Sequence, residues 1–90
     1  MMTYDVFFRL VREKTKFHRR KDLSFVPRKG QSLQLVLSRG DSENVTAKFV
    51  VDNVHYDEDQ DYHLVTISAA DSETIRDEDF ETELWNKIAV

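Results

Sequence analysis

The chain has 90 residues, 40% of them hydrophobic, with one proline and two glycines. This length allows a single domain, 1–90, with one modest core, and the composition excludes a disordered linker. Cysteine is absent, which excludes disulfides, zinc–thiolate sites and thiol catalysis. No apolar run is long enough for a transmembrane helix or a signal peptide. We therefore expect a soluble, cytoplasmic protein without membrane contact.

The net charge of −4 conceals a division along the chain. Residues 1–40 hold ten Lys and Arg against three Asp and Glu, which makes +7. Residues 41–90 hold three Lys and Arg against fourteen Asp and Glu, which makes −11. Such a split indicates charged partners. The alternative is that the two halves interleave in the fold and neutralise each other across neighbouring strands.

The first elements are a strand, a basic segment and a turn. Alternating side chains over residues 4–11 predict a strand, and Phe7 on its second face predicts that this face is partly covered. The basic segment Arg12–Lys21 follows, and we expect it to form a loop. Pro27-Arg28-Lys29-Gly30 predicts a turn, since proline and glycine stand where a turn needs them.

Two strands with a bend are expected next. Leu33, Leu35 and Leu37 alternate with Gln34 and Val36, which predicts a half-buried strand. The polar turn Arg39-Gly40-Asp41-Ser42 separates this strand from an alternating one over 45–51. The apolar phase breaks at Asp52-Asn53 and resumes at Val54. This break predicts a β-bulge, an extra residue that restores the inward face and bends the strand.

The segment His55–His63 is nearly palindromic and predicts a hairpin. Folded about Asp59, it places Tyr56 opposite Tyr62 and His55 opposite His63. Aromatic pairs of this kind help to set the register of a hairpin. Residues 64–67 complete the partner strand.

After Asp71 the spacing of apolar residues changes to four. Phe80, Leu84 and Ile88, with Trp85 beside them, predict an amphipathic helix over about 77–89. These four residues either cap the sheet or contact a second copy, in which case a homodimer forms through the helix. The predicted fold class is mainly β (α+β), a small antiparallel barrel or curled sheet of 4–5 strands within residues 3–70, followed by this helix.

One stretch of the sequence carries a family pattern. A Pro-x-x-Gly turn, Pro27–Gly30, opens a strand, and the valine-rich run over 50–55 leads into a polar hairpin. Residues 25–67 thereby resemble small SH3-like β-barrel proteins of bacteria and their phages. The resemblance implies an SH3-like barrel whose function is to bind peptides, proteins or nucleic acid and not to catalyse a reaction.

The basic segment and the proline turn together form a candidate patch for a protein partner or nucleic acid. Its Lys and Arg side chains would neutralise phosphates, and its aromatic ring would stack on an unpaired base. The alternative is a solvated loop that pairs with acids of the second half. The residues of this patch are Arg12, Lys14, Lys16, Phe17, Arg19, Arg20, Lys21, Arg28 and Lys29.

The hairpin tip forms a candidate acidic patch for a partner, made of Asp57, Glu58, Asp59 and Asp61. Together with the acids of residues 71–83, it would present a surface that imitates a phosphate backbone and blocks a basic channel. The alternative is a solubilising hairpin tip beside the acidic first turn of a helix.

Metal and catalytic motifs are not apparent in the sequence. The Asp57-x-Asp59-x-Asp61 pattern lacks the glycine and glutamate of a calcium loop, since Tyr62 and Ser68 stand there. His55 and His63 have no third ligand at a suitable spacing. There is no phosphate-binding glycine loop and no nucleophile motif. We predict no metal, no cofactor, no catalytic residue and no enzymatic activity.

The predicted function is a non-enzymatic binding module, an accessory or regulatory protein of a bacterium or phage. It would recognise a protein partner through a charged surface, because complementary charge supplies specificity. Two alternatives stay open. One is a nucleic-acid-binding protein that uses Arg12–Lys21, and the other is an acidic mimic of nucleic acid.

Overall fold

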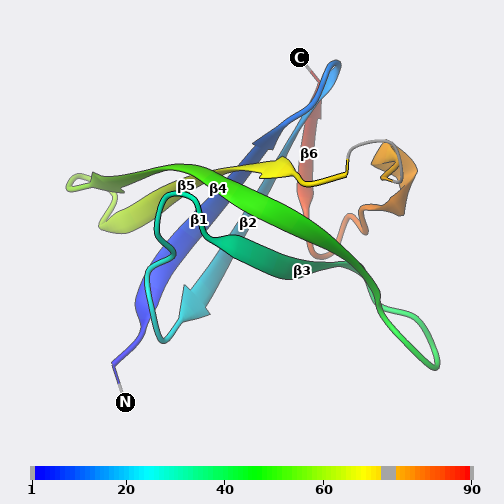
Figure 1. Ribbon diagram of the computed structural model, residues 1–90, viewed down its shortest axis with the longest axis horizontal. Helices are drawn as coiled ribbons and strands as arrows, with labels where there is room; N and C mark the ends of the chain where they lie inside the picture. Colours follow the sequence, from blue (N-terminus) through cyan, green and yellow to red (C-terminus); the bar gives the residue numbers. More distant parts are fainter. Residues whose placement is uncertain (1, 72–74, 90) are drawn as a thin grey trace.

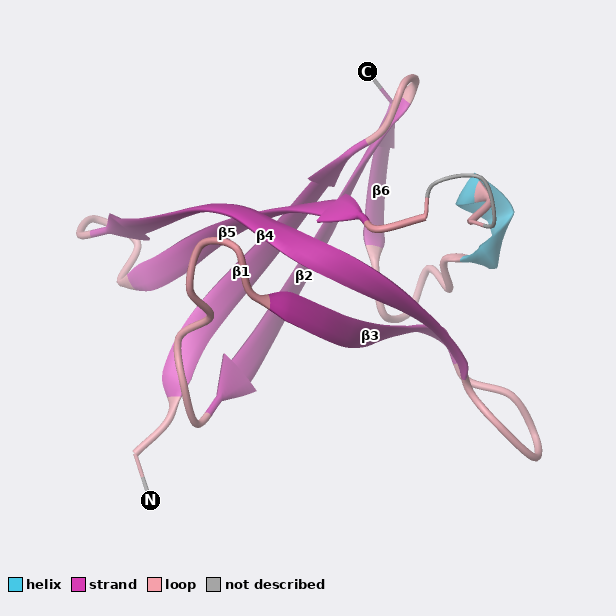
Figure 2. Cartoon of the chain, viewed as in Figure 1, coloured by secondary structure: helices cyan, strands magenta, loops and turns pink. Residues whose placement is uncertain are grey.

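The computed structural model describes residues 2–71 and 75–89, which form one six-stranded sheet in the order β3-β4-β5-β1-β2-β6 (Figures 1 and 2). Neighbouring strands are antiparallel except β1 and β5, which are parallel. The prediction of a mainly β fold is confirmed, with six strands where 4–5 were expected. The strands are β1 (Tyr4–Val11), β2 (Thr15–Leu23), β3 (Ser32–Ser38), β4 (Val45–Asp57), β5 (Tyr62–Ala69) and β6 (Asn86–Ala89).

The sheet curls into a half-barrel around its core, and β3 crosses in front of β1 and β2 (Figure 1). Alternate side chains of each strand point inward, as strand geometry requires. The segment 75–85 supplies three more core residues, Ile75, Phe80 and Trp85. The sheet contributes the others, which are Val6, Phe8, Leu10, Phe17, Leu37, Phe49, Val51, Val65 and Ile67.

The basic segment is part of the sheet, and the expected loop is wrong. Most of it lies in β2, which pairs with β1 so that Phe17 is opposite Leu10 and Arg19 is opposite Phe8. Residues opposite each other in an antiparallel pair share a face, so Phe17 and Arg19 point inward. Charged residues surround the single inward aromatic, which is why the alternation was not visible in the sequence.

The long strand β4 bends at the predicted bulge. Val51 pairs with Ile67 while Asn53 pairs with Thr66, so Asp52 is the extra residue and the prediction is confirmed. The predicted hairpin register is wrong by one step, because Tyr56 lies opposite His63. The turn itself explains the shift, since Asp61 has a left-handed φ of 57° and its N–H donates to the Asp57 carbonyl. Four residues, 58–61, are therefore needed in the loop.

The predicted C-terminal helix over 77–89 is wrong. Residues Asp77–Asp79 form one 3₁₀ turn, and the chain then enters strand β6, which pairs with the outer edge of β2. A helix of this length is marginal without tertiary support. Here the tertiary environment favours a strand, since β2 presents unpaired backbone groups that Asn86–Ala89 satisfy.

The opening between β3 and β2 is bridged by side chains. The Val36 carbonyl on β3 accepts hydrogen bonds from Trp85 Nε1 at 3.0 Å and from Arg19 Nη1 at 3.1 Å. The Arg19 guanidinium also lies over the Trp85 ring, 5.7 Å from its centroid. The Glu81 N–H donates to the next carbonyl, Leu37, at 2.9 Å. These contacts use backbone groups on the free edge of β3 and hold segment 75–85 over the core.

Candidate functional site

Aromatic and basic side chains gather on the outer face of the sheet. Segment 75–85 packs on the inner face, and no described element covers the outer side of β1, β2 and β6. We call this surface the basic–aromatic face. It comprises Phe7, Arg9, Val11, Lys16, His18, Arg20, Tyr62 and Ile88, as the registers of β1, β2, β5 and β6 show.

Three rings form a row across this face. Phe7 stacks on Tyr62 with 5.1 Å between ring centroids and 19° between planes, and it meets His18 at 5.0 Å. Each ring comes from a different strand, so neighbouring strands support the row. All three side chains are half-buried, because they pack against one another on a face that no described element covers.

The cations on this face differ in their pairing. Arg20 forms a bidentate ion pair with Asp5 and lies 5.5 Å from the Tyr62 ring centroid. The Arg20 hydrogen bond holds the pKa of the Asp5 carboxyl below its ordinary value of 3.8. Arg9 and Lys16 have no ion pair with any described residue. They carry the unneutralised positive charge of the face.

His18 lies between these two cations. Its pKa is lowered from the ordinary 6.5, first by burial and then by the charges of Arg9 and Lys16. Arg9 Nε and His18 Nε2 are both shielded from solvent and have no hydrogen-bond partner among the described residues. Buried polar groups are normally paired, so this unpaired couple distinguishes the face from an ordinary solvated surface.

Exposed hydrophobic side chains flank Lys16. Val11 lies opposite Lys16 on β1, and Ile88 lies opposite it on β6. Their exposed fractions are 50% for Val11 and 40% for Ile88. Single exposed hydrophobic residues are common on protein surfaces. Here two of them stand in one row with a cation between them, next to the aromatic row.

The predicted basic patch is not one surface. Phe17 is fully buried and stacks on Phe80 with 4.0 Å between centroids, so its ring is not available to a base. Arg19 points inward to Trp85. Arg28 and Lys29 lie on the turn before β3, away from the basic–aromatic face. Among the nine predicted residues, the structure brings Lys16 and Arg20 together with Arg9, which sequence reasoning missed because it stands in a different strand.

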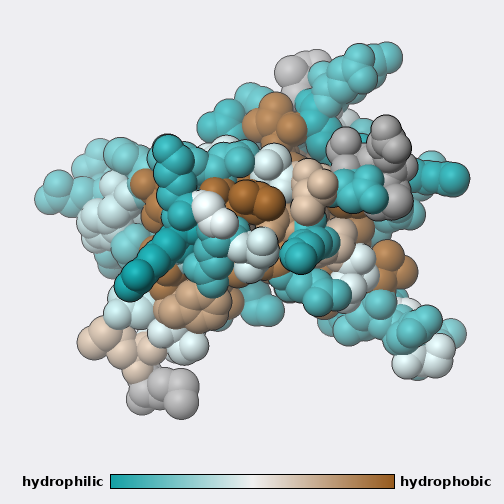
Figure 3. All heavy atoms as spheres, viewed as in Figure 1, coloured by the Kyte–Doolittle hydropathy of each residue, from teal (hydrophilic) through white to brown (hydrophobic). Residues whose placement is uncertain are grey.

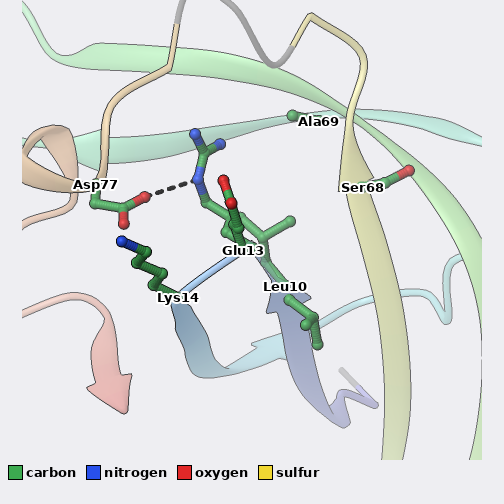
Figure 4. A pocket seen from close by; sticks show the side chains of 8 residues that line it. Leu10, Glu13, Lys14, Ser68, Ala69 and Asp77 are labelled. Carbon is green, nitrogen blue, oxygen red and sulfur yellow. Dashed lines mark ion pairs between the residues drawn. The ribbon is translucent and has the colours of Figure 1, made fainter. Parts of the chain in front are cut away.

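Arg12 connects the two charged halves of the chain. Its Nε lies 2.7 Å from Asp77 Oδ1, and its Nη2 donates to the Ile75 carbonyl at 2.9 Å. Figure 4 shows the ion pair as a dashed line to Asp77, at the edge of a groove of about 690 Å³ that also contains Glu13 and Lys14. A further pair of contacts joins Arg39 to Glu81 and Glu83. Part of the charge division is therefore neutralised within the fold.

The acidic hairpin tip points away from these cations, at the far end of β4 and β5 (Figure 1). Its contacts are local: Tyr56 donates from its hydroxyl to Asp61 Oδ1 at 2.7 Å, and the Gln60 N–H donates to Asp57 Oδ1 at 3.0 Å. Bonding to Asp61 raises the pKa of Tyr56. No ion pair joins the tip to the rest of the described chain, so no described cation neutralises its carboxylates.

The two histidines expected to face each other lie on opposite faces of the sheet. His55 is opposite Leu64, whereas His63 is opposite Tyr56 and its ring also meets Tyr4. Within residues 2–71 and 75–89, no three His, Asp or Glu side chains gather as metal ligands would.

The same residues contain no helix with the length and apolarity needed to cross a bilayer. Figure 3 shows the side with β3 and β4, where hydrophilic residues separate small hydrophobic spots.

No family model, no curated protein and no solved structure matches this chain. The resemblance to SH3-like barrels therefore stays a prediction, and the proposals for function depend on the geometry alone.

Proposed function

We propose that the protein is a non-enzymatic binding module whose basic–aromatic face holds a protein partner with acidic and hydrophobic side chains. The observation that carries this proposal is the uncovered sheet face on which the Phe7–Tyr62–His18 row adjoins arginine and exposed aliphatic residues. Aromatic residues and arginine are enriched in the centres of protein interfaces. Strands hold these side chains in place, so little conformational entropy is lost when they bind.

The charges of the face specify the partner. Arg9 and Lys16 are unneutralised, while Arg20 is already paired with Asp5, so the net positive charge is small and local. A partner carboxylate would form charge-assisted hydrogen bonds with the unneutralised side chains of Arg9 and Lys16. Val11 and Ile88 would be buried against apolar groups of the same partner. Nucleic acid is the less favoured ligand, because Phe17 and Arg19 are turned into the core. The acidic-mimic hypothesis stays a prediction.

Site-specific photo-crosslinking tests this proposal. A photoreactive amino acid is placed at Val11 or Ile88, and at Val45 as a control, because Val45 is 48% exposed but lies at the start of β4. After irradiation in a lysate of the source organism, we expect the same protein on positions 11 and 88 and not on position 45. The charge reversal Lys16→Glu should abolish the adduct, whereas Lys48→Glu, an exposed lysine on β4, should leave it unchanged.

Other outcomes contradict the proposal. Adducts that disappear on nuclease treatment would show nucleic acid on this face in place of protein. Equal adducts at all three positions would show non-specific contact, and no adduct at positions 11 and 88 would overturn the binding face itself.

A further inference from the structure

A second groove lies outside the basic–aromatic face, between the loop before β3 and the ends of β1 and β4. It has a volume of about 700 Å³, within the range of ligand sites. Its apolar walls are Tyr4 of β1, Val54 of β4 and the loop residues Phe25, Val26 and Pro27. Because Tyr4 and Val54 pack against the core, the groove opens toward the inner side of the half-barrel.

The basic side of the groove is a preformed turn. Gln31 N–H donates to the Arg28 carbonyl at 3.0 Å, and Gly30 has a φ of +88°, which favours glycine. Gly30 N–H donates to the Val51 carbonyl at 2.8 Å, which fixes the turn to β4. Pro27 is fully buried. The turn therefore does not need to rearrange when a ligand enters.

This loop has charged side chains and backbone groups that lack partners among the described residues. Arg28 and Lys29 are exposed on the rim and form no ion pair with the described residues. The backbone groups of residues 24–26 form no hydrogen bond with any described residue. In addition, 44% of Phe25 is exposed beside them. An apolar recess, free backbone groups and two cations thus occur together.

We propose that this groove binds an extended acidic peptide segment of a partner protein. One apolar side chain of the segment would enter between Tyr4, Phe25 and Val54. Its main chain would form hydrogen bonds with the free backbone groups of residues 24–26. Its carboxylates would form charge-assisted hydrogen bonds with Arg28 and Lys29. This site goes beyond the proposed function, because it shares no residue with the basic–aromatic face.

Four synthetic decapeptides test the chemistry of this site. The four peptides differ only at the central position, which is Leu or Ser, and at the flanking positions, which are Glu or Lys. Each is titrated to millimolar concentration into the ¹⁵N-labelled protein, and amide resonances are followed by NMR. We expect only the Leu and Glu peptide to shift the resonances of residues 24–31 in a saturable manner. Saturable shifts from the Leu and Lys peptide, shifts centred elsewhere, or no shift with any peptide would overturn the proposal.

A pair of variants separates this site from the other face. The double variant Arg28→Glu and Lys29→Glu removes no ion pair and should keep the wild-type fold, with resonances changed only next to the two substitutions, but should bind the Leu and Glu peptide about tenfold more weakly. Lys48→Glu is the matched control and should bind as the wild type does. The photo-crosslinks from positions 11 and 88 should persist in the double variant, so either proposal can fail without the other. Unchanged peptide affinity in the double variant would refute the role of the basic rim.

Discussion

Replacing Phe17 by alanine tests whether the basic segment is part of the core. The Phe17 side chain is fully buried, its ring stacks on Phe80, and the Lys87 Nζ lies 5.8 Å from its centroid. Burying such a side chain contributes about 1.5–3 kcal/mol, and the cavity left behind raises the total loss to about 3–5 kcal/mol. Domains of this size unfold with roughly 5–15 kcal/mol, so Phe17→Ala should remove a large part of the stability.

The assay is urea denaturation followed by the fluorescence of Trp85, the only tryptophan. Phe25→Ala is the matched control, because Phe25 is 44% exposed, and it should lower the free energy of unfolding by less than about 1 kcal/mol. Phe17→Leu should fall between the two. The placement of β2 would be refuted if Phe17→Ala destabilised the protein no more than Phe25→Ala does, as a ring in a solvated loop would.

Two substitutions and one titration have definite expected results. Gly30→Ala should cost about 1–2 kcal/mol in urea denaturation, because alanine is strained at a φ of +88° although its methyl group would meet no atom within 4 Å. Asp5→Asn should lower stability at neutral pH and lose this effect as the pH falls below the depressed pKa of Asp5, since protonation removes its ion pair with Arg20; equal effects at pH 7 and pH 2 in denaturation curves would contradict this. NMR titration should show His18 with a pKa below 6.5. The contribution of His18 to the free energy of unfolding is then complete above pH 6.5 and is lost as the pH falls from 6.5 toward the folded-state pKa, because only the unfolded state is protonated in that interval. A value above 6.5 would mean that burial and Arg9 do not act on it as described.

Local sequence patterns predicted the strands in which every second residue is hydrophobic and points inward. The alternation in β1, β3 and β4 indicated their positions, and the break at Asp52-Asn53 indicated the bulge. The pattern was misleading in the hairpin, because the near-palindrome is symmetrical about Asp59, whereas the turn with its left-handed Asp61 gives a pairing that is offset by one residue. One residue of register is enough to place His55 and His63 on opposite faces.

The sequence by itself determined the β class of this protein, its turns and the division of its charge, because these depend on neighbouring residues. Only the tertiary structure decided that Thr15–Leu23 is a central strand and Asn86–Ala89 an edge strand. The backbone of β2 pairs with β1 and β6, and the backbone of β6 pairs with β2, which is far away in the sequence. This pairing outweighs the local preference for a loop or a helix. The same pairing brings Arg9, Lys16 and Tyr62 to one face, and it turns Arg19 and Phe17 into the core.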